Sequence, residues 1–114
     1  MLVRMSLLGV LIGCAEVDAE RVAEIVSLEG DAVHGEATFD DNCRGCHGPE
    51  GVGVLLGGPS LQSEAWAAEE VVAQVLVGGF GMPAFEGELS DEEIADVAAY
   101  VADVLSQPEV DGAF

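Results

Sequence analysis

The ten residues NCRGCHGPEG, from Asn42 to Gly51, hold two of the three cysteines and one of the two histidines in this 114-residue chain. Cys43 and Cys46 are three positions apart, so on a helix their thiols lie about one turn from each other. His47 follows directly, and its imidazole can turn toward the same side. One short segment therefore carries three of the five cysteine and histidine side chains in this chain.

The spacing Cys43-x-x-Cys46-His47 is the attachment sequence for c-type haem. Each thiol can add to a vinyl group on one edge of a porphyrin, and the histidine can then bind the iron. A zinc site would need a fourth ligand. No second C-x-x-C occurs, and if Cys14 is modified only His34 is left, which we expect at the surface. A thioredoxin-like redox pair belongs beside a strand and a helix, and no strand pattern is present. The motif therefore favours one covalently bound haem c over zinc or dithiol chemistry.

Met82 is the candidate for a second iron ligand. The other methionines are Met1 and Met5, which lie in a segment that resembles a cleaved leader. Met82 lies in a glycine-rich stretch, where Pro83 stiffens the backbone and Phe85 can cover one face of a porphyrin. A methionine among apolar residues is ordinarily core packing. Beside a haem-attachment motif, we favour its role as a ligand.

Three stretches carry helix signals. Asp31 can cap a helix that runs toward Asn42. A shorter helix is expected over about 68–77, where two glycines end it. Ser90 and Glu93 form a capping box, and apolar residues then repeat at helical spacing as far as Leu105.

The connections between these helices are long and rich in glycine. Residues 48–59 and 78–87 show no strand-like alternation. Loops of that length in a small domain are usually functional. The pattern predicts an all-α fold, with three or four helices and long loops around one haem.

From Gly30 to about Leu105 the chain resembles a class I c-type cytochrome, a family of small monohaem electron carriers. The segments that carry the resemblance are, in order, GDAVHGEATFDDNCRGCHGPEGVG, GGPSL and GGFGMPAFEGELSDEEIADVAAYV. The resemblance implies the small cytochrome c fold. It also implies that the first and last helices of that fold cross at Gly35, Phe39, Val97 and Tyr100, which would explain a glycine within a helix.

The same resemblance implies roles for individual residues. Cys43 and Cys46 become the thioether residues, His47 the proximal iron ligand and Met82 the distal one. The carbonyl of Pro59 is expected to accept a hydrogen bond from the proximal imidazole and so to orient it. With both axial positions filled, the implied function is one-electron transfer, by a membrane-tethered carrier or a respiratory-chain component, without enzymatic activity or a small-molecule substrate. The alternatives are a haem subunit of a larger dehydrogenase or oxidase complex, and an open-site protein that binds peroxide or a diatomic gas.

The N-terminal segment resembles a lipoprotein signal. An arginine at position 4 precedes an apolar run that is much shorter than the roughly 20 residues needed to span a bilayer. The run ends in LIGC, which resembles the bacterial lipobox, where cleavage precedes a cysteine that becomes lipidated; this cysteine is Cys14. An ordinary cleaved signal is the alternative. We predict a periplasmic protein that is lipid-anchored at Cys14. The expected segments are a signal peptide at 1–13, a tether at 14–29, a haem domain at 30–107 and a tail at 108–114. The tether has room for a short amphipathic helix.

The charge balance is strongly acidic. Twenty-two acidic residues face three arginines, there is no lysine, and the formal net charge is −19. Such a surface repels nucleic acids and anionic lipid headgroups. Many c-type cytochromes carry lysines around the haem edge, and this chain has none. A solvated, salt-tolerant surface is the favoured interpretation, and docking to a basic redox partner is the second. Trp66 and Arg44 are the available donors for haem propionates.

Overall fold

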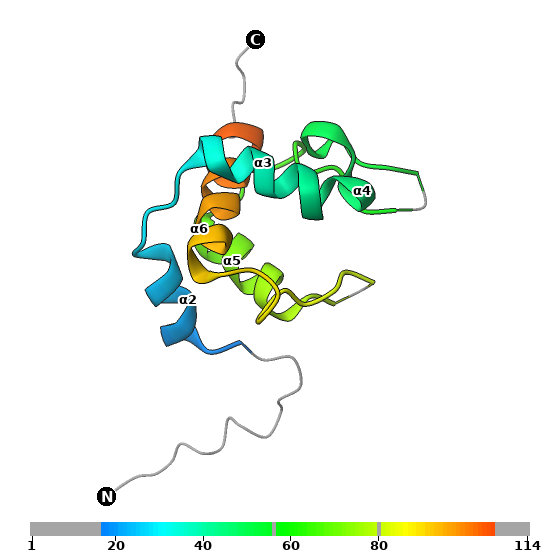
Figure 1. Ribbon diagram of the computed structural model, residues 1–114. Helices are drawn as coiled ribbons and strands as arrows, with labels where there is room; N and C mark the ends of the chain where they lie inside the picture. The colour runs from blue at the N-terminus through cyan, green and yellow to red at the C-terminus, as the bar shows by residue number, and fades with distance from the viewer. Residues whose placement is uncertain (1–16, 56, 80, 107–114) are drawn as a thin grey trace, which may run out of the picture.

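The computed structural model describes residues 17–55, 57–79 and 81–106, and over these ranges the chain consists of helices joined by irregular loops (Figure 1). The only β-type pairing in them consists of two isolated bridges. The predicted all-α fold is thus confirmed. The elements are α2 (Ala19–Val26), α3 (Ala32–Asn42), α4 (Arg44–His47), the short 3-10 helix η2 (Pro49–Gly51), α5 (Ala68–Val77), α6 (Asp91–Ala99) and η3 (Tyr100–Leu105), a π-helix.

The helices α3 and α6 cross at very close range. A Cβ atom added to Gly35 would lie 2.0 Å from the carbonyl oxygen of Asp96 and 2.9 Å from the Cβ atom of Tyr100. Beside this contact, the rings of Phe39 and Tyr100 pack edge to face with 5.4 Å between their centroids. Val97 is buried in the same region. The crossing predicted at these residues is confirmed, and only glycine fits at its centre.

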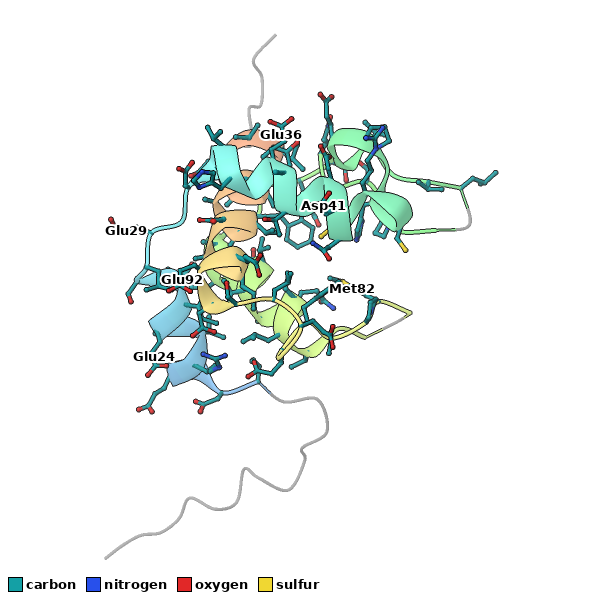
Figure 2. All side chains as sticks on the ribbon, viewed as in Figure 1. Glu24, Glu29, Glu36, Asp41, Met82 and Glu92 are labelled. Atoms are coloured by element: carbon teal, nitrogen blue, oxygen red, sulfur yellow. The ribbon has the colours of Figure 1, made fainter. Side chains whose placement is uncertain are left out.

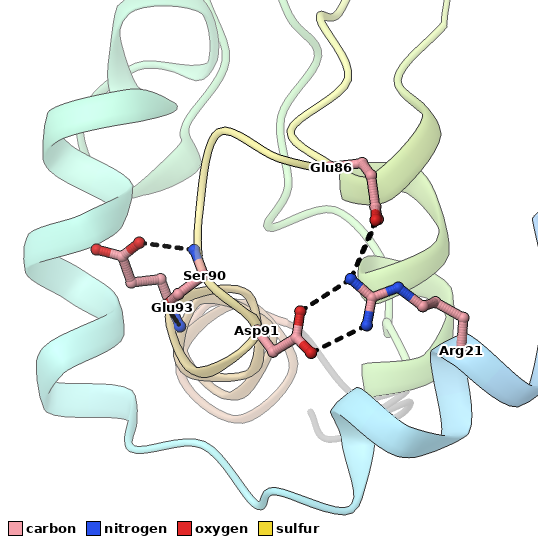
Figure 3. Close-up of polar contacts among 5 residues, drawn as sticks. All are labelled: Arg21, Glu86, Ser90, Asp91 and Glu93. Atoms are coloured by element: carbon pink, nitrogen blue, oxygen red, sulfur yellow. Dashed lines mark hydrogen bonds and ion pairs between the residues drawn. The ribbon is translucent and has the colours of Figure 1, made fainter.

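The helix starts follow the capping signals in the sequence. The Asp31 carboxylate accepts a hydrogen bond from the N–H of Val33, at 2.8 Å. The Ser90 hydroxyl accepts from the N–H of Glu93 at 3.0 Å, and the Glu93 carboxylate accepts from the N–H of Ser90 at 2.9 Å (Figure 3). The capping box therefore sets the first residue of α6 at Asp91.

The last helix differs from the regular one that its periodicity predicts. After Ala99 it continues as the π-helix η3, which is closed by a hydrogen bond from the N–H of Ser106 to the carbonyl of Val101, five residues earlier. The Ser106 hydroxyl accepts a hydrogen bond from the N–H of Trp66 at 2.6 Å. The wider turn therefore ends where the helix meets the segment that leads into α5.

The hydrophobic core lies among α2, α3, α5, α6 and η3. Its most deeply buried large side chains are Ile25, Phe39, Val72, Ile94 and Val97. Within the described ranges, no helix has the length and apolar character needed to cross a bilayer.

The helix α2 extends this core beyond the boundary expected at Gly30. Val22 and Ile25 are one turn apart and both are buried, with Ile25 completely inaccessible. Residues 19–26, which the sequence places in a tether, thus pack as part of the domain, because an apolar stripe interrupts their acidic residues. Cys14 and the expected signal peptide lie outside the described residues.

Candidate functional site

The C-x-x-C-H motif occupies the short helix α4 and the residue before it. The carbonyl of Cys43 accepts hydrogen bonds from the N–H groups of Cys46, at 3.2 Å, and His47, at 3.0 Å. Both thiols and the imidazole therefore belong to a single helical turn. Neither cysteine is in a disulfide; Cys43 is buried and Cys46 is exposed.

The buried thiol is held in its neutral form. Burial, together with the neighbouring Cys46, raises the pKa of the Cys43 thiol to about 11. With no group bound to it, this thiol is therefore protonated at neutral pH. Among the described residues, no three His, Cys, Asp or Glu side chains are grouped so that they could hold a metal ion.

The imidazole of His47 is oriented by the backbone of Pro59. Its Nδ1 lies 3.0 Å from the Pro59 carbonyl oxygen. Because a carbonyl only accepts, Nδ1 carries the proton, and Nε2 is left with the lone pair that binds metals. Gly58 packs under the ring, where an added Cβ atom would lie 2.7 Å from Nδ1. This is the contact that the resemblance implies for a proximal histidine.

The loop after α4 is bonded back to the motif. The N–H of Gly53 donates to the carbonyl of His47, and the N–H of Gly58 donates to the carbonyl of Cys46, both at 2.6 Å. Carbonyls at the end of a helix need such partners. The loop therefore supports the turn that carries the motif and brings Pro59 to the histidine.

Met82 lies in the loop that follows α5, on the same side of the molecule as α4 (Figure 2). The helix α5 ends at Val77 and is followed by the capping residue Gly78, whose φ is +67°. Gly79 and Met82 exchange two backbone hydrogen bonds of 2.9 and 3.0 Å, and the N–H of Phe85 donates to the carbonyl of Val75 at 2.8 Å. The Met82 side chain is half-buried against the edge of the core.

These residues fit a haem c. Two thiols on one turn can form the thioethers, and His47 and Met82 offer an imidazole and a thioether from two separate segments. Of the remaining candidates, Arg44 lies exposed in α4 between the two cysteines, whereas His34 and Trp66 have other partners. His34 is exposed and pairs with Asp31 at 3.5 Å. Trp66, considered as a propionate donor, uses its Nε1–H for the carbonyl of Leu61 at 3.1 Å.

Two residues that contribute to the structure around the site, Gly58 and Arg21, were not singled out from the sequence. Gly58 contacts the histidine ring, and its sequence signals are its place in the segment GGPSL and its position directly before Pro59. Arg21 forms ion pairs with Glu86 and Asp91. Its signal is that it is one of three arginines among 22 acidic residues, in a helix with an apolar stripe.

Comparisons with known proteins identify the fold and the family. The family model described as "Cytochrome C oxidase, cbb3-type, subunit III" matches residues 30–101, more than half of the chain. Cytochrome c6 from Thermosynechococcus vestitus is 39% identical over 83 residues, which are 68% of this chain and 73% of that protein. Cytochrome c6 from Leptolyngbya boryana is 43% identical over 79 residues, 64% of this chain and 92% of that protein.

A solved structure leads to the same assignment. Cytochrome c6 from the diatom Phaeodactylum tricornutum superposes with a TM-score of 0.55 at 40% identity, covering 64% of this chain and 92% of the diatom protein. The helix α2 precedes the residues matched by the family model. The sequence motif, the all-α fold and these relatives agree, and the chain therefore belongs to this family: it is a class I monohaem c-type cytochrome, similar to cytochrome c6.

Proposed function

We propose that this cytochrome is a membrane-tethered one-electron carrier, in which Cys43 and Cys46 bind haem c covalently while His47 and Met82 ligate the iron. Its similarity to cytochrome c6 makes it an electron carrier with one haem c and not an enzyme. The residue roles and the tether are the proposed part.

The observation that carries the proposal is the hydrogen bond of 3.0 Å between His47 Nδ1 and the Pro59 carbonyl. It assigns the proton to Nδ1 and leaves Nε2 available for iron, and it restrains the ring before any ligand binds.

The loops of the chain would hold both iron ligands in place. Haem iron, when bound, stores one electron by changing between the ferric and ferrous states. His47 supplies a fixed nitrogen ligand, and the backbone pairing of Gly79 with Met82 restrains the sulfur ligand on its own loop. Ligands that hold their places in both oxidation states keep reorganisation small, and a His/Met pair raises the reduction potential.

The test is the visible spectrum of the haem-loaded protein, oxidised and reduced. We expect a low-spin ferrous spectrum and, in the ferric state, the weak red-edge band of an iron–sulfur bond to methionine. Met82→Ala should lose that band, whereas His34→Ala should keep it, because His34 lies exposed on α3. A high-spin wild-type spectrum would favour an open site for peroxide or a diatomic gas, and a protein without covalent haem would contradict the proposal altogether.

The proposed membrane tether is a lipid at Cys14, on the periplasmic side of a bacterial membrane. It is supported by the sequence LIGC at the end of a short apolar run. Cys14→Ser should release the protein from membranes and remove the mass of the lipid from its N-terminus. Retention of the variant in the membrane fraction would contradict this part of the proposal.

The proposed partner is a redox protein with a basic docking surface. Asp40 and Asp41 are exposed in the last turn of α3, with only Asn42 between them and Cys43, and the chain carries 22 acidic residues in all. Figure 2 labels Asp41. Electrostatic attraction of this kind raises association rates and weakens with salt. Electron exchange with a basic partner should therefore slow steeply as ionic strength rises, and an exchange rate independent of salt would argue against basic docking.

A second candidate function is that of a haem subunit in a larger complex. The family model takes its description from an oxidase subunit, which favours this reading. Purification in mild detergent distinguishes the two. A monomer that exchanges electrons quickly supports the free carrier, whereas stable co-purification with other redox subunits supports the complex.

A further inference from the structure

Arg21 joins three separate parts of the fold. Its Nη1 and Nη2 atoms donate to the two carboxylate oxygens of Asp91, each at 2.9 Å, and Nη2 also donates to Glu86 at 3.1 and 3.3 Å (Figure 3). Arg21 belongs to α2, Asp91 is the first residue of α6, and Glu86 lies in the loop between α5 and α6. A planar guanidinium that binds one carboxylate with two parallel bonds fixes geometry as well as charge.

The loop held by Arg21 is the one that carries Met82. Most of its hydrogen bonds are local, such as those between Gly79 and Met82 and those from Glu88 and Leu89 to Phe85. In the described residues 81–89, Met82, Phe85 and Leu89 pack against the core, and two polar contacts reach other helices: the N–H of Phe85 to Val75 in α5, and the Glu86 carboxylate to Arg21. Only three residues separate Met82 from Glu86, so the ion pair restrains the chain close to the methionine.

The acidic residues around Arg21 increase the effect that its loss would have on the loop. Glu86 and Asp91 bind the same guanidinium, and exposed acids at Glu88 and Glu92 lie in the same stretch of chain. Without the cation these carboxylates would repel one another, and few polar contacts to other helices hold this loop against that repulsion. The hydrogen bonds also raise the pKa of Arg21, so the cation persists at any working pH.

We propose that Arg21 is a positioning residue that clamps the Met82 loop to α2 and α6 and so keeps the methionine sulfur in place as the iron ligand. The proposal rests on the proposed ligation by Met82. Arg21 precedes the residues 30–101 matched by the family model, so the family comparison assigns it no role. The clamp would make the N-terminal helix part of the haem-binding structure.

The experiment compares Glu86→Gln and Arg21→Gln with Glu88→Gln in the haem-loaded protein. Glu88 is exposed in the same loop, and Glu88→Gln removes one negative charge, as Glu86→Gln does. Arg21 forms its ion pairs with Glu86 and Asp91 and not with Glu88. Imidazole is titrated into each ferric protein, because it binds the iron only when the methionine has moved away. Heating is then followed by both the red-edge band and far-UV circular dichroism.

For the two clamp variants we expect imidazole binding about two- to fivefold tighter than in Glu88→Gln, the range that exposed ion pairs support. Added salt should reduce the difference. The red-edge band should disappear at a lower temperature than the helical signal, since the loop opens before the helices unfold. A residue that merely stabilised the fold would shift both transitions together.

Two results would contradict the clamp, and they differ. If the wild type shows the red-edge band but all three variants bind imidazole equally, the clamp is wrong and the ligation by Met82 stands. If the wild type lacks the band, Met82 does not ligate the iron, and the role proposed for Arg21 is then also wrong. The Glu86→Gln variant leaves the bidentate contact to Asp91 intact, so it keeps the test informative if Arg21→Gln does not fold.

Discussion

Gly35→Ala is the single substitution that most directly tests the crossing of α3 and α6. The added Cβ atom would lie 2.0 Å from the carbonyl oxygen and 2.6 Å from the carbonyl carbon of Asp96, and 2.9 Å from the Cβ atom of Tyr100. Real Cβ atoms essentially never show contacts under 3.0 Å, so the backbones must separate by about 1 Å at least. Because two of these neighbours are backbone atoms of a helix, no rotamer change can relieve the contact.

The cost follows from what that separation disturbs. Overpacking a well-packed site costs about 1–3 kcal/mol. We expect the cost at Gly35 to lie at the upper end of this range, because the added Cβ atom meets backbone atoms of Asp96 that cannot rotate away. Alanine regains about 1 kcal/mol over glycine through its helix propensity. The expected net loss in the free energy of unfolding is therefore about 2 kcal/mol. For a domain of this size that lowers the melting temperature by about 8–16 °C.

The assay is equilibrium guanidinium unfolding of the haem-loaded protein, followed by far-UV circular dichroism. Gly45→Ala is the matched control, since nothing lies within 4 Å of the position of its Cβ atom. It should be neutral or slightly stabilising, and mass spectrometry verifies that the haem is attached. If Gly35→Ala changes the free energy of unfolding by less than about 0.5 kcal/mol, which is the ordinary range for surface positions, the close crossing is not a feature of the folded protein.

Three further predictions concern charge and the histidine. Hydrogen bonds from Arg21 hold the pKa of Asp91 below its ordinary value of 3.8, so this contact stabilises the fold at neutral pH and is lost as the pH falls below about 4. In guanidinium titrations, Asp91→Asn should therefore be less stable than wild type at pH 7 and equal to it near pH 2. A difference in the free energy of unfolding that persists in acid would contradict this. Gly58→Ala should displace the His47 ring, weaken its hydrogen bond and raise the midpoint potential in redox titration, while Gly57→Ala, whose Cβ atom meets nothing closer than 3.1 Å, should change it much less. Added salt should raise the wild-type potential, because it screens the acidic surface that favours the ferric state, and a potential that falls or stays constant would remove that argument.

Much of the fold could be predicted because its signals are local. Asp31, Ser90 and Glu93 cap helices through atoms two or three residues away, and a capping pattern can be read directly from neighbouring letters. The crossing at Gly35 came instead from the family resemblance, since spacing alone does not distinguish a contact glycine from a weak point in a helix.

What could not be predicted depends on contacts between distant residues. Arg21 lies 65 and 70 positions from its two carboxylate partners, so no local pattern reveals the pairing. The packing of α2 was missed for a related reason, because its buried stripe consists of only Val22 and Ile25 within an acidic segment. The π-helical end of α6 also has no periodic signal, since it depends on where Ser106 meets Trp66.

The arrangement of the helices links stability to the position of the ligands. The helix α3 ends at Asn42 and leads directly into Cys43, while the Met82 loop leads directly into α6 at Asp91. The crossing at Gly35 therefore fixes the relative placement of the two segments that supply His47 and Met82. A change at the crossing should alter stability and both ligand-bearing segments together, whereas a change at Arg21 should act on the methionine side first. The order in which heat abolishes the iron–sulfur band and the helical signal thus distinguishes a defect of the helix crossing from a defect of the clamp.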